Sequence, residues 1–379
     1  MTLLHRTLTR FALSLAALGL AACSGLGTGS GESESPPDAS AEESRPAELL
    51  ALEDRLTAIG LGFDGYLGIA VVDLDNGELA ALNGEEWFPQ QSVSKLWVAI
   101  AALDEADAGE LDLGETATVS FEDLTLFYQP VRKLVLANGS FAASYEEFIR
   151  RALTESDNTA NDMVLRRVGG PDAVRDMLAA KELPGIRFGP GERAMQSSIA
   201  AMEWRQLYAL EENFFKARKL VPVAARREAF DAYVTDPVDG AQPAAIARAL
   251  ARLAQGKLLG PEASARMLGW LGEVKSGPNR LKGGLPEGWG IAHKTGTGQV
   301  LDIVPPGVIG EQAGYNDVGI LTAPDGRRYA VAVMIGRTKR PVPERMDLMH
   351  AVVAAVADYH YAVTGQPRPQ VPPPQEMIP

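Results

Sequence analysis

The chain has 379 residues, of which 36 are Lys or Arg, 49 are Asp or Glu, four are His and one is Cys. The formal net charge of −13 argues against a nucleic-acid-binding surface, because such surfaces concentrate Lys and Arg. A single Cys excludes an intramolecular disulfide and a Cys-rich zinc site, and the four His residues are too scattered to indicate a metal centre. The length is sufficient for a large buried core.

The first residues have the features of an export signal. A short positively charged segment precedes an apolar run over residues 11–20, which is too short for a permanent membrane span. The run ends in small residues directly before Cys23, and this arrangement resembles the lipobox of bacterial lipoproteins. The resemblance implies removal of residues 1–22 as a lipoprotein signal peptide, lipidation of Cys23 and attachment to a membrane. An ordinary signal peptide with an incidental Cys is the alternative.

Two further segments lack the apolar residues needed for a core. Residues 23–46 are dominated by Gly, Ser, Glu and Pro, and we expect a disordered acidic tether there. Residues 364–379 are rich in Pro and are expected to form an extended or disordered tail. The folded domain is therefore expected to span residues 47–363.

Hydrophobic spacing predicts the elements of this domain in chain order. We expect a helix at 47–59, strands at 66–74 and 78–83, helices at 92–108, 144–155 and 159–168, strands at 290–294, 316–321 and 328–335, and a closing helix at 346–361. Strands at both ends with helices between them indicate an α+β fold. Its antiparallel sheet is built from N- and C-terminal segments and flanked by helices, with an inserted all-helical region.

The first motif with chemical potential is Ser92-Val-Ser-Lys95, at the start of a predicted helix. A spacing of three residues places the hydroxyl and the amine on one helix face. A buried Lys whose charged form is disfavoured can be neutral and accept the proton of the hydroxyl, which makes Ser92 a candidate nucleophile. Taken alone, the motif is also compatible with an ordinary surface Ser and Lys.

The second motif, Ser156-Asp157-Asn158, lies between two predicted helices. Asp and Asn are favoured in such turns because they cap helices. In a catalytic interpretation, Ser156 relays a proton to a leaving nitrogen and the Asn158 amide holds a substrate amide.

The third motif is Lys294-Thr-Gly-Thr-Gly298, at the end of a predicted strand. Gly296 would allow a substrate backbone to approach the strand closely. The Lys294 ammonium and the Thr295 hydroxyl would bind a carboxylate, and the N–H of Thr297 would pair with that of Ser92 as an oxyanion hole.

The order of these three motifs, Ser-x-x-Lys, Ser-Asp-Asn and Lys-Thr-Gly, is typical of class A β-lactamases and penicillin-binding proteins. The chain therefore resembles a class A serine β-lactamase over nearly all of its folded domain, with a β-lactamase/transpeptidase-like fold. Residues 285–289 and 316–320 also resemble the corresponding segments of that family. Tyr128 matches the family's aromatic gate residue.

The resemblance implies a Glu that activates water for release of the acyl group, thirty-six residues after the serine of Ser-Asp-Asn. Position 192 meets this spacing from Ser156 and is Glu, and Gln196 stands where the family has a water-holding Asn. The usual Glu-Pro-Glu-Leu-Asn sequence is absent. A solvated surface Glu at this position is the alternative, and Glu182 and Glu203 are nearby competitors for the role.

Two stretches depart from the family pattern. Residues 197–220 and 221–235 are predicted to form helices, and the family has no segment of this length there. This insertion, at about 197–240, either adds helical packing or forms a wall that reshapes the substrate cleft. The stretch 299–315 is longer than the family's usual turn after Lys-Thr-Gly.

The carboxylate of a substrate usually pairs with an Arg near the Lys-Thr-Gly strand, as implied by the resemblance. Val318 occupies the position where many relatives carry this Arg. Arg280, fourteen residues before Lys294, and Arg345, at the start of the final helix, are the candidates in this chain. A solvated surface Arg is the alternative for each.

We therefore expect a lipid-anchored serine β-lactamase that forms an acyl-enzyme on Ser92. We expect a β-lactam as its small-molecule substrate, a monomeric state and the periplasmic face of the outer membrane, or the outer face of the cell membrane, as its location. No nucleic acid, metal or organic cofactor is implied. A D-alanyl-D-alanine carboxypeptidase-like penicillin-binding protein without the deacylating Glu is one alternative. A non-catalytic lipoprotein that binds cell-wall peptides is the other.

Overall fold

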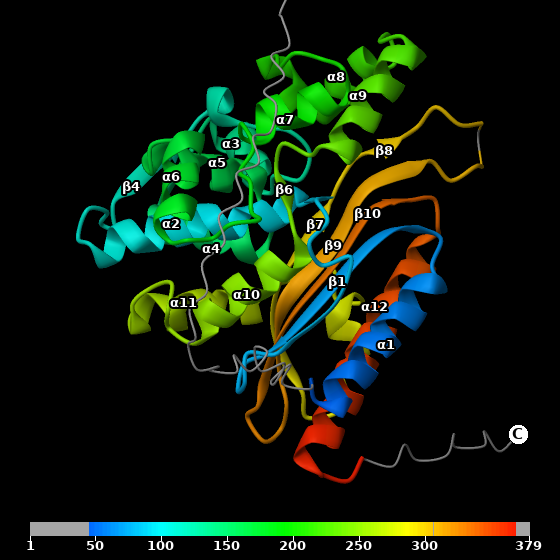
Figure 1. The fold of residues 1–379 in the computed structure, drawn as a ribbon. Helices are drawn as coiled ribbons and strands as arrows, with labels where there is room; N and C mark the ends of the chain where they lie inside the picture. Colours follow the sequence, from blue (N-terminus) through cyan, green and yellow to red (C-terminus); the bar gives the residue numbers. More distant parts are fainter. Residues whose placement is uncertain (1–44, 306, 369–379) are drawn as a thin grey trace, which may run out of the picture. The chain divides into compact units, whose positions relative to one another are not determined.

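The computed structural model describes residues 45–305 and 307–368, and in this part of the chain helices cover both faces of a six-stranded sheet (Figure 1). Cys23, the signal peptide, nearly all of the tether and most of the Pro-rich tail lie outside the described residues. The strands are β1 (Gly65–Asp73), β2 (Leu79–Leu82), β3 (Phe88–Pro89), β4 (Thr116–Val119), β5 (Phe141–Ser144), β6 (Gly240–Ala241), β7 (Gly290–Thr297), β8 (Val300–Leu301), β9 (Glu311–Thr322) and β10 (Arg328–Thr338).

The large sheet joins the two ends of the domain, as the sequence predicted. Its order is β2-β1-β10-β9-β7, with β8 also paired to β9, and all of its pairings are antiparallel. The strand that follows the first helix therefore lies beside the last strand of the chain. β7, which carries the Lys-Thr-Gly motif, lies at an edge of the sheet.

The helices divide between the sheet and a separate helical region (Figure 1). They are α1 (Ala47–Leu61), α2 (Lys95–Asp107), α3 (Val131–Asn138), α4 (Tyr145–Thr154), α5 (Asn158–Arg167), α6 (Pro171–Ala180), α7 (Glu192–Ile199), α8 (Glu211–Arg218), α9 (Val223–Thr235), α10 (Pro243–Ala254), α11 (Pro261–Gly272) and α12 (Val342–Thr364). Four 3₁₀ turns complete them: η1 (Gln91–Ser94), η2 (Phe121–Asp123), η3 (Gln206–Ala209) and η4 (Leu281–Gly284).

Alternate residues of the central strands enter two different cores. In β1, Ile69 and Val71 pack with α1 and α12, whereas Ala70 and Val72 pack with the core of α2, α4, α5, α10 and α11. The side-chain period of two in a strand produces this division. Because both faces are buried, β1 and β10 are apolar almost throughout.

The predicted elements agree with the structure except in the insertion and after the Lys-Thr-Gly strand. The prediction of one helix over 197–220 is wrong: α7 ends at Ile199, and the turn η3 and the short helix α8 follow. The prediction of a helix near 221–235 is confirmed by α9. The long stretch after β7 contains β8, and β9 begins at Glu311, so the connecting loop is shorter than 299–315.

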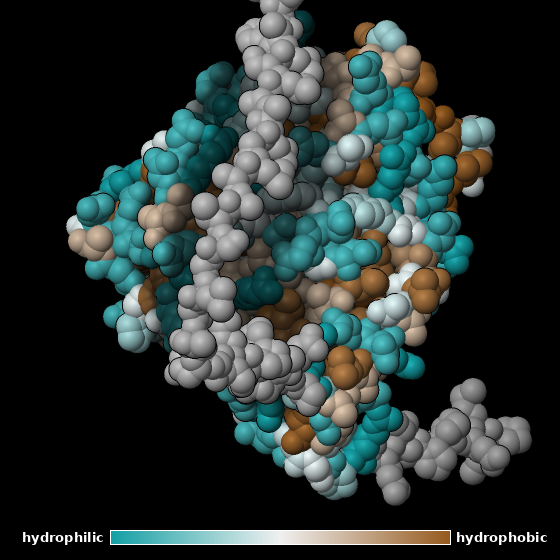
Figure 2. Space-filling view, in the orientation of Figure 1, coloured by the Kyte–Doolittle hydropathy of each residue, from teal (hydrophilic) through white to brown (hydrophobic). Residues whose placement is uncertain are grey.

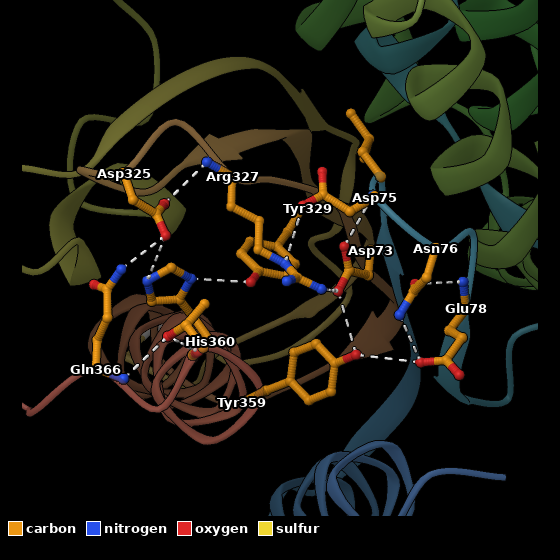
Figure 3. Close-up of polar contacts among 12 residues, drawn as sticks. Asp73, Asp75, Asn76, Glu78, Asp325, Arg327, Tyr329, Tyr359, His360 and Gln366 are labelled. Atoms are coloured by element: carbon orange, nitrogen blue, oxygen red, sulfur yellow. Dashed lines mark hydrogen bonds and ion pairs between the residues drawn. The ribbon is translucent and has the colours of Figure 1, made fainter.

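A buried polar cluster fixes the end of the sheet opposite the motifs (Figure 3). Asp73, which is 1% exposed, pairs with Arg327 at 2.5 Å and accepts a hydrogen bond from Tyr359 at 3.3 Å. The Tyr329 hydroxyl lies 3.0 Å from Nδ1 of His360. These contacts join the β1–β2 turn, the β9–β10 hairpin and the end of α12. The partners of Asp73 also offset the free-energy cost of burying its charge.

Hydrophobic residues gather at one rim of the surface. Figure 2 shows them along the edge formed by α8, α9 and the β8–β9 loop. The large exposed apolar side chains in and next to these segments are Leu220, Val223, Val300, Val308 and Ile309. Among the described residues, no helix is long and apolar enough to cross a membrane. The same residues contain no cluster of three or more His, Cys, Asp or Glu side chains arranged to bind a metal ion.

Candidate active site

Ser92 and Lys95 lie at the junction of η1 and α2. The turn η1 places Ser92 one helical turn before Lys95, and Lys95 Nζ donates to Ser92 Oγ at 2.8 Å. Lys95 is 1% exposed. Burial lowers the pKa of its amine, and the negative charges of Glu192 and Asp162 oppose this shift. The arrangement therefore places a readily neutralised amine against a half-buried hydroxyl, as the first motif predicted.

A second pair of the same kind involves Lys294 and Ser156. Lys294 on β7 is fully buried, and its Nζ donates to Ser156 Oγ at 2.9 Å. Burial lowers the pKa of Lys294 well below its ordinary value, and the positive charges of Lys95 and Arg280 lower it further. Ser156 has a left-handed backbone with φ of 59°, an uncommon conformation for a residue other than Gly. The second and third motifs are thus in contact.

The Ser-Asp-Asn turn also positions the segment of Tyr128, the residue that the sequence predicted as an aromatic gate. Asp157 caps α5 by accepting from Ala160 N at 2.9 Å, and it accepts from Val131 N at 2.7 Å. The N–H of Asn158 donates to the Tyr128 carbonyl at 3.0 Å. Tyr128 is 62% exposed, so its ring is available to a ligand. The cap expected of this motif and its place in the site are therefore compatible.

Glu192 is the carboxylate that the structure brings to the motifs. It is the first residue of α7, and its Oε1 accepts from Asn158 Nδ2 at 2.9 Å. Glu182 and Glu203, the two nearby competitors, are exposed. Glu192 is partly buried and, through Asn158, contacts the second motif, which favours a place in the site over an isolated surface position.

Gln196 lies one turn after Glu192, but its amide is bound by other side chains. Its Nε2 donates to Gln91 Oε1 at 2.8 Å, and its Oε1 accepts from Gln299 Nε2 at 3.0 Å. Gln196 is 3% exposed. Both ends of the amide that was expected to hold a water are thus engaged within the protein.

The end of β7 lies directly against the start of η1. A Cβ on Gly296 would lie 2.4 Å from the carbonyl oxygen of Gln90, so only Gly permits this approach. Arg280 is buried, and its guanidinium donates to the Gly296 carbonyl at 3.0 Å and to Thr297 Oγ1 at 2.5 Å. The interpretation of Arg280 as a solvated surface residue is therefore wrong.

Arg345 shares an aromatic neighbour with Arg280 but makes no hydrogen bond to the Lys-Thr-Gly strand among the described residues. It is 3% exposed, and its guanidinium donates to the Arg340 carbonyl at 2.7 Å and stacks over the Tyr315 ring. Arg280 stacks over the same ring at 3.8 Å. Val318 is fully buried opposite Lys294 in the sheet. Of the two Arg candidates, only Arg280 contacts the Lys-Thr-Gly strand.

Two polar residues beside the site were missed in the sequence. Ser276 Oγ lies 2.6 Å from Thr295 Oγ1, and no local pattern indicates this contact. Asp162 is buried, and one of its carboxylate oxygens has no hydrogen-bond partner among the described residues. Its spacing of four from Asn158 on α5 was the available signal, because that spacing places both on one helix face.

The insertion (residues 197–240) contacts two segments beside the site, one before Tyr128 and one after the Lys-Thr-Gly strand. On one side, Gln206 Nε2 donates to the carbonyls of Phe121 at 2.6 Å and Leu124 at 3.1 Å, close in sequence to the gate residue. On the other side, Arg218 and Arg226 pair with Asp302 in the β8–β9 loop at 2.6 and 2.8 Å. The insertion therefore links two segments that lie far apart in the sequence. Its contacts are thus not limited to packing among its own helices.

Comparisons with known proteins agree with this geometry. A family model described as "Beta-lactamase enzyme family" matches residues 51–360. The chain is 28% identical over 316 residues to the extended-spectrum β-lactamase PER-1 of Pseudomonas aeruginosa, covering 83% of this chain and 88% of that protein. It is 25% identical over 292 residues to β-lactamase VEB-1 of the same species, covering 77% and 83%.

Solved structures give the same result. An ancestral class A β-lactamase (GNCA) is 27% identical and superposes with a TM-score of 0.63, covering 81% of this chain and 99% of that one. A β-lactamase from Chitinophaga pinensis is 25% identical with a TM-score of 0.65, covering 82% and 99%.

The buried carboxyl of Asp162 generates a prediction about stability. Burial, and then the charge of Glu192, raises the pKa of Asp162 from 3.8 to about 6. A raised pKa means that protonation favours the folded state, so this contribution to stability is present below pH 4 and is lost as the pH rises through 6. Asp162→Asn should therefore stabilise the protein at pH 7.5, on the order of 3 kcal/mol, and this gain should disappear near pH 4.

Thermal unfolding of both proteins across this pH range measures the difference. The exposed Asp347→Asn in α12 is the matched control and should not change the pH dependence. If the stability of Asp162→Asn and that of the wild type depend on pH in the same way, the surroundings do not disfavour the ionised form of Asp162, and the prediction is wrong.

Proposed function

We propose that this chain, which belongs to the β-lactamase enzyme family, opens β-lactam rings by forming an ester on Ser92 and then hydrolysing it. The observation that carries the proposal is the pairing of two buried amines with two serine hydroxyls, at 2.8 Å for Lys95–Ser92 and 2.9 Å for Lys294–Ser156. A nucleophile, a base and a proton donor are thereby assembled from motifs far apart in the chain.

Acylation uses both pairs. Lys95 accepts the proton of Ser92 as Oγ attacks the lactam carbonyl carbon, and the lowered pKa of the Lys95 amine makes its neutral form accessible. The N–H groups of Ser92 and Thr297 would hold the developing oxyanion. Ser156 then donates its proton to the lactam nitrogen as the carbon–nitrogen bond breaks. Lys294, hydrogen-bonded to Ser156, can resupply that hydroxyl with a proton.

Deacylation requires water to attack the ester, and Glu192 is the base we assign to it. Its carboxylate is held by Asn158 at 2.9 Å, and it acts electrostatically on Lys95. The proton of water passes to Glu192, and the ester oxygen leaves as the Ser92 hydroxyl by taking back the proton that Lys95 accepted during acylation. This step distinguishes a β-lactamase from a penicillin-binding peptidase, which retains the acyl group.

Substrate binding is assigned to groups around β7. The carboxylate of a β-lactam would pair with Arg280, Lys294 and Thr295, because a guanidinium, an ammonium and a hydroxyl converge near this strand. Gly296 would let the substrate backbone lie against the strand edge. Asn158 would bind the side-chain amide, and the exposed ring of Tyr128 would flank the entrance.

The role of Ser92 generates the first prediction of function. Ser92→Ala should lower kcat/KM for the chromogenic cephalosporin nitrocefin by about a thousandfold or more, because the nucleophile is lost. The exposed Ser198 on α7 provides the control, and Ser198→Ala should retain activity. A Ser92→Ala protein as active as the wild type, or a wild type inert to every class of β-lactam, would exclude the proposed function.

The role of Glu192 is tested by the lifetime of the acyl-enzyme. Removing the base should slow deacylation by about a hundredfold or more, so Glu192→Gln should retain a penicilloyl adduct that the wild type releases quickly. Time-resolved intact-mass spectrometry measures the adduct, and Glu203→Gln is the matched exposed control. An adduct that persists for hours in the wild type would instead support a carboxypeptidase-like penicillin-binding protein. The absence of any adduct would support a non-catalytic binding protein.

We also propose that the protein is held at a membrane through lipid on Cys23, with the catalytic domain on the periplasmic or outer side. The supporting feature is the run of small residues before Cys23. Cys23→Ser should move the protein from the membrane fraction to the soluble fraction of a producing bacterium, whereas Ser24→Ala should leave it with the membranes. A Cys23→Ser protein that stays in the membrane fraction would contradict the lipid anchor.

A further inference from the structure

Tyr233 in α9 connects the insertion to the residue before the nucleophile. The Tyr233 side chain is buried, and its hydroxyl accepts from Gln91 Nε2 at 2.5 Å and donates to Asp239 Oδ1 at 3.0 Å. The other oxygen of Asp239 accepts from the backbone N–H of Gln91 at 2.7 Å. Tyr233 and Asp239 thus hold both the side chain and the backbone of one residue.

Gln91 needs such support because of its backbone. Its φ is 54°, in the left-handed region, and it directly precedes Ser92. A residue other than Gly in this conformation persists only where the surrounding structure imposes it. The conformation sets the direction in which η1 leaves β3, and therefore the place of the Ser92 hydroxyl and N–H.

The same glutamine also contacts the helix of Glu192. Gln91 Oε1 accepts from Gln196 Nε2 at 2.8 Å, and Gln196 follows Glu192 by one turn of α7. Gln91, Asp239 and Gln196 are each at most 3% exposed. Gln91 therefore lies between the group that forms the acyl-enzyme and the group assigned to hydrolyse it.

We propose that Tyr233 is a positioning residue for both chemical steps, through which the insertion fixes Gln91 and thereby the separation of Ser92 from Glu192. This inference rests on the proposed hydrolysis of β-lactams at Ser92. Removing the hydroxyl leaves Gln91 Nε2 without its acceptor and Asp239 Oδ1 without its donor, and both groups are buried. Gln91 then loses one of the contacts that support its strained backbone, while its N–H bond to Asp239 Oδ2 remains.

Tyr233→Phe tests this assignment because it removes one oxygen and retains the ring. We expect kcat for nitrocefin to fall about tenfold, with KM changed by less than about threefold, because positioning rather than binding is lost. Acylation and deacylation rates, measured by stopped-flow and intact-mass spectrometry, should both decrease, whereas Glu192→Gln slows deacylation alone. The control is Tyr145→Phe in α4, a buried tyrosine whose hydroxyl has no hydrogen-bond partner among the described residues.

A pH profile separates positioning from a loss of stability. Burial raises the pKa of Asp239 to about 6, and the hydrogen bonds from Gln91 and Tyr233 oppose this shift while the charge of Glu192 adds to it. Without the Tyr233 hydroxyl the pKa of Asp239 rises further. Because the positioning role makes the place of Ser92 depend on the bond from the Gln91 N–H to the Asp239 carboxylate, protonation of Asp239 should lower activity, and the acid limb of kcat/KM should move to higher pH by about half a unit or more in Tyr233→Phe. A purely structural role would lower the melting temperature and leave this limb in place.

The outcomes also separate this inference from the proposed function. Unchanged kcat and pH profile in Tyr233→Phe, with an active wild type, would overturn the positioning role and leave the proposed function intact. A wild type that is acylated at Ser92 but releases nothing would overturn the proposed hydrolase, and the positioning role is then decided by the acylation rate of Tyr233→Phe. A double-mutant cycle with Gln91→Met should be strongly non-additive, because both changes act through one contact, and additive effects would contradict the inference.

Discussion

The burial of two lysine amines in one site is the constraint on which the rest of the structure depends. An ammonium group in a dry environment is costly unless it is paired, and here Lys95 and Lys294 also repel each other. Burial lowers the pKa of both amines, and the carboxylates Glu192 and Asp157 act on Lys95 in the opposite direction. The net effect is a lowered pKa for Lys95, and this makes its neutral form more accessible for accepting the proton of Ser92.

The fold provides this environment by bringing an edge strand against the start of a helix. β7 supplies Lys294, η1 and α2 supply Ser92 and Lys95, and the close approach at Gly296 leaves no room for a larger residue. Asn316 Nδ2 donates to the Pro89 carbonyl at 2.7 Å and so fastens the segment before η1 to the sheet. The insertion adds a second support, because α9 reaches Gln91 and α8 reaches the loop after β8. In this chain the segment that departs most from the family pattern thus contacts the residue next to the nucleophile.

Sequence patterns predicted the parts of the molecule that depend on local spacing. The period of the apolar residues located α1, β1, β10 and α12 to within a few residues. The three motifs predicted four side chains that the structure places in two hydrogen-bonded pairs, Lys95 with Ser92 and Lys294 with Ser156. The resemblance to class A serine β-lactamases that rested on these motifs is confirmed by the family model. The contacts of Tyr233, Asp239 and Ser276 could not be predicted, because each joins residues that only the tertiary fold brings together. The prediction of a single helix over 197–220 was wrong because apolar spacing does not reveal where the chain must turn. The turn lets this segment contact both the stretch before Tyr128 and the loop after β8.

The titration of Lys95 tests the central claim most directly. Protein labelled with carbon-13 at the ε-carbon of lysine, with the signal assigned by Lys95→Arg, reports the pKa of this amine by NMR. The account predicts that Lys95 titrates clearly below its ordinary pKa of 10.5. A Lys95 that titrates at or above that value would show that the amine stays charged at neutral pH, and it could not then be the group that accepts the proton of Ser92.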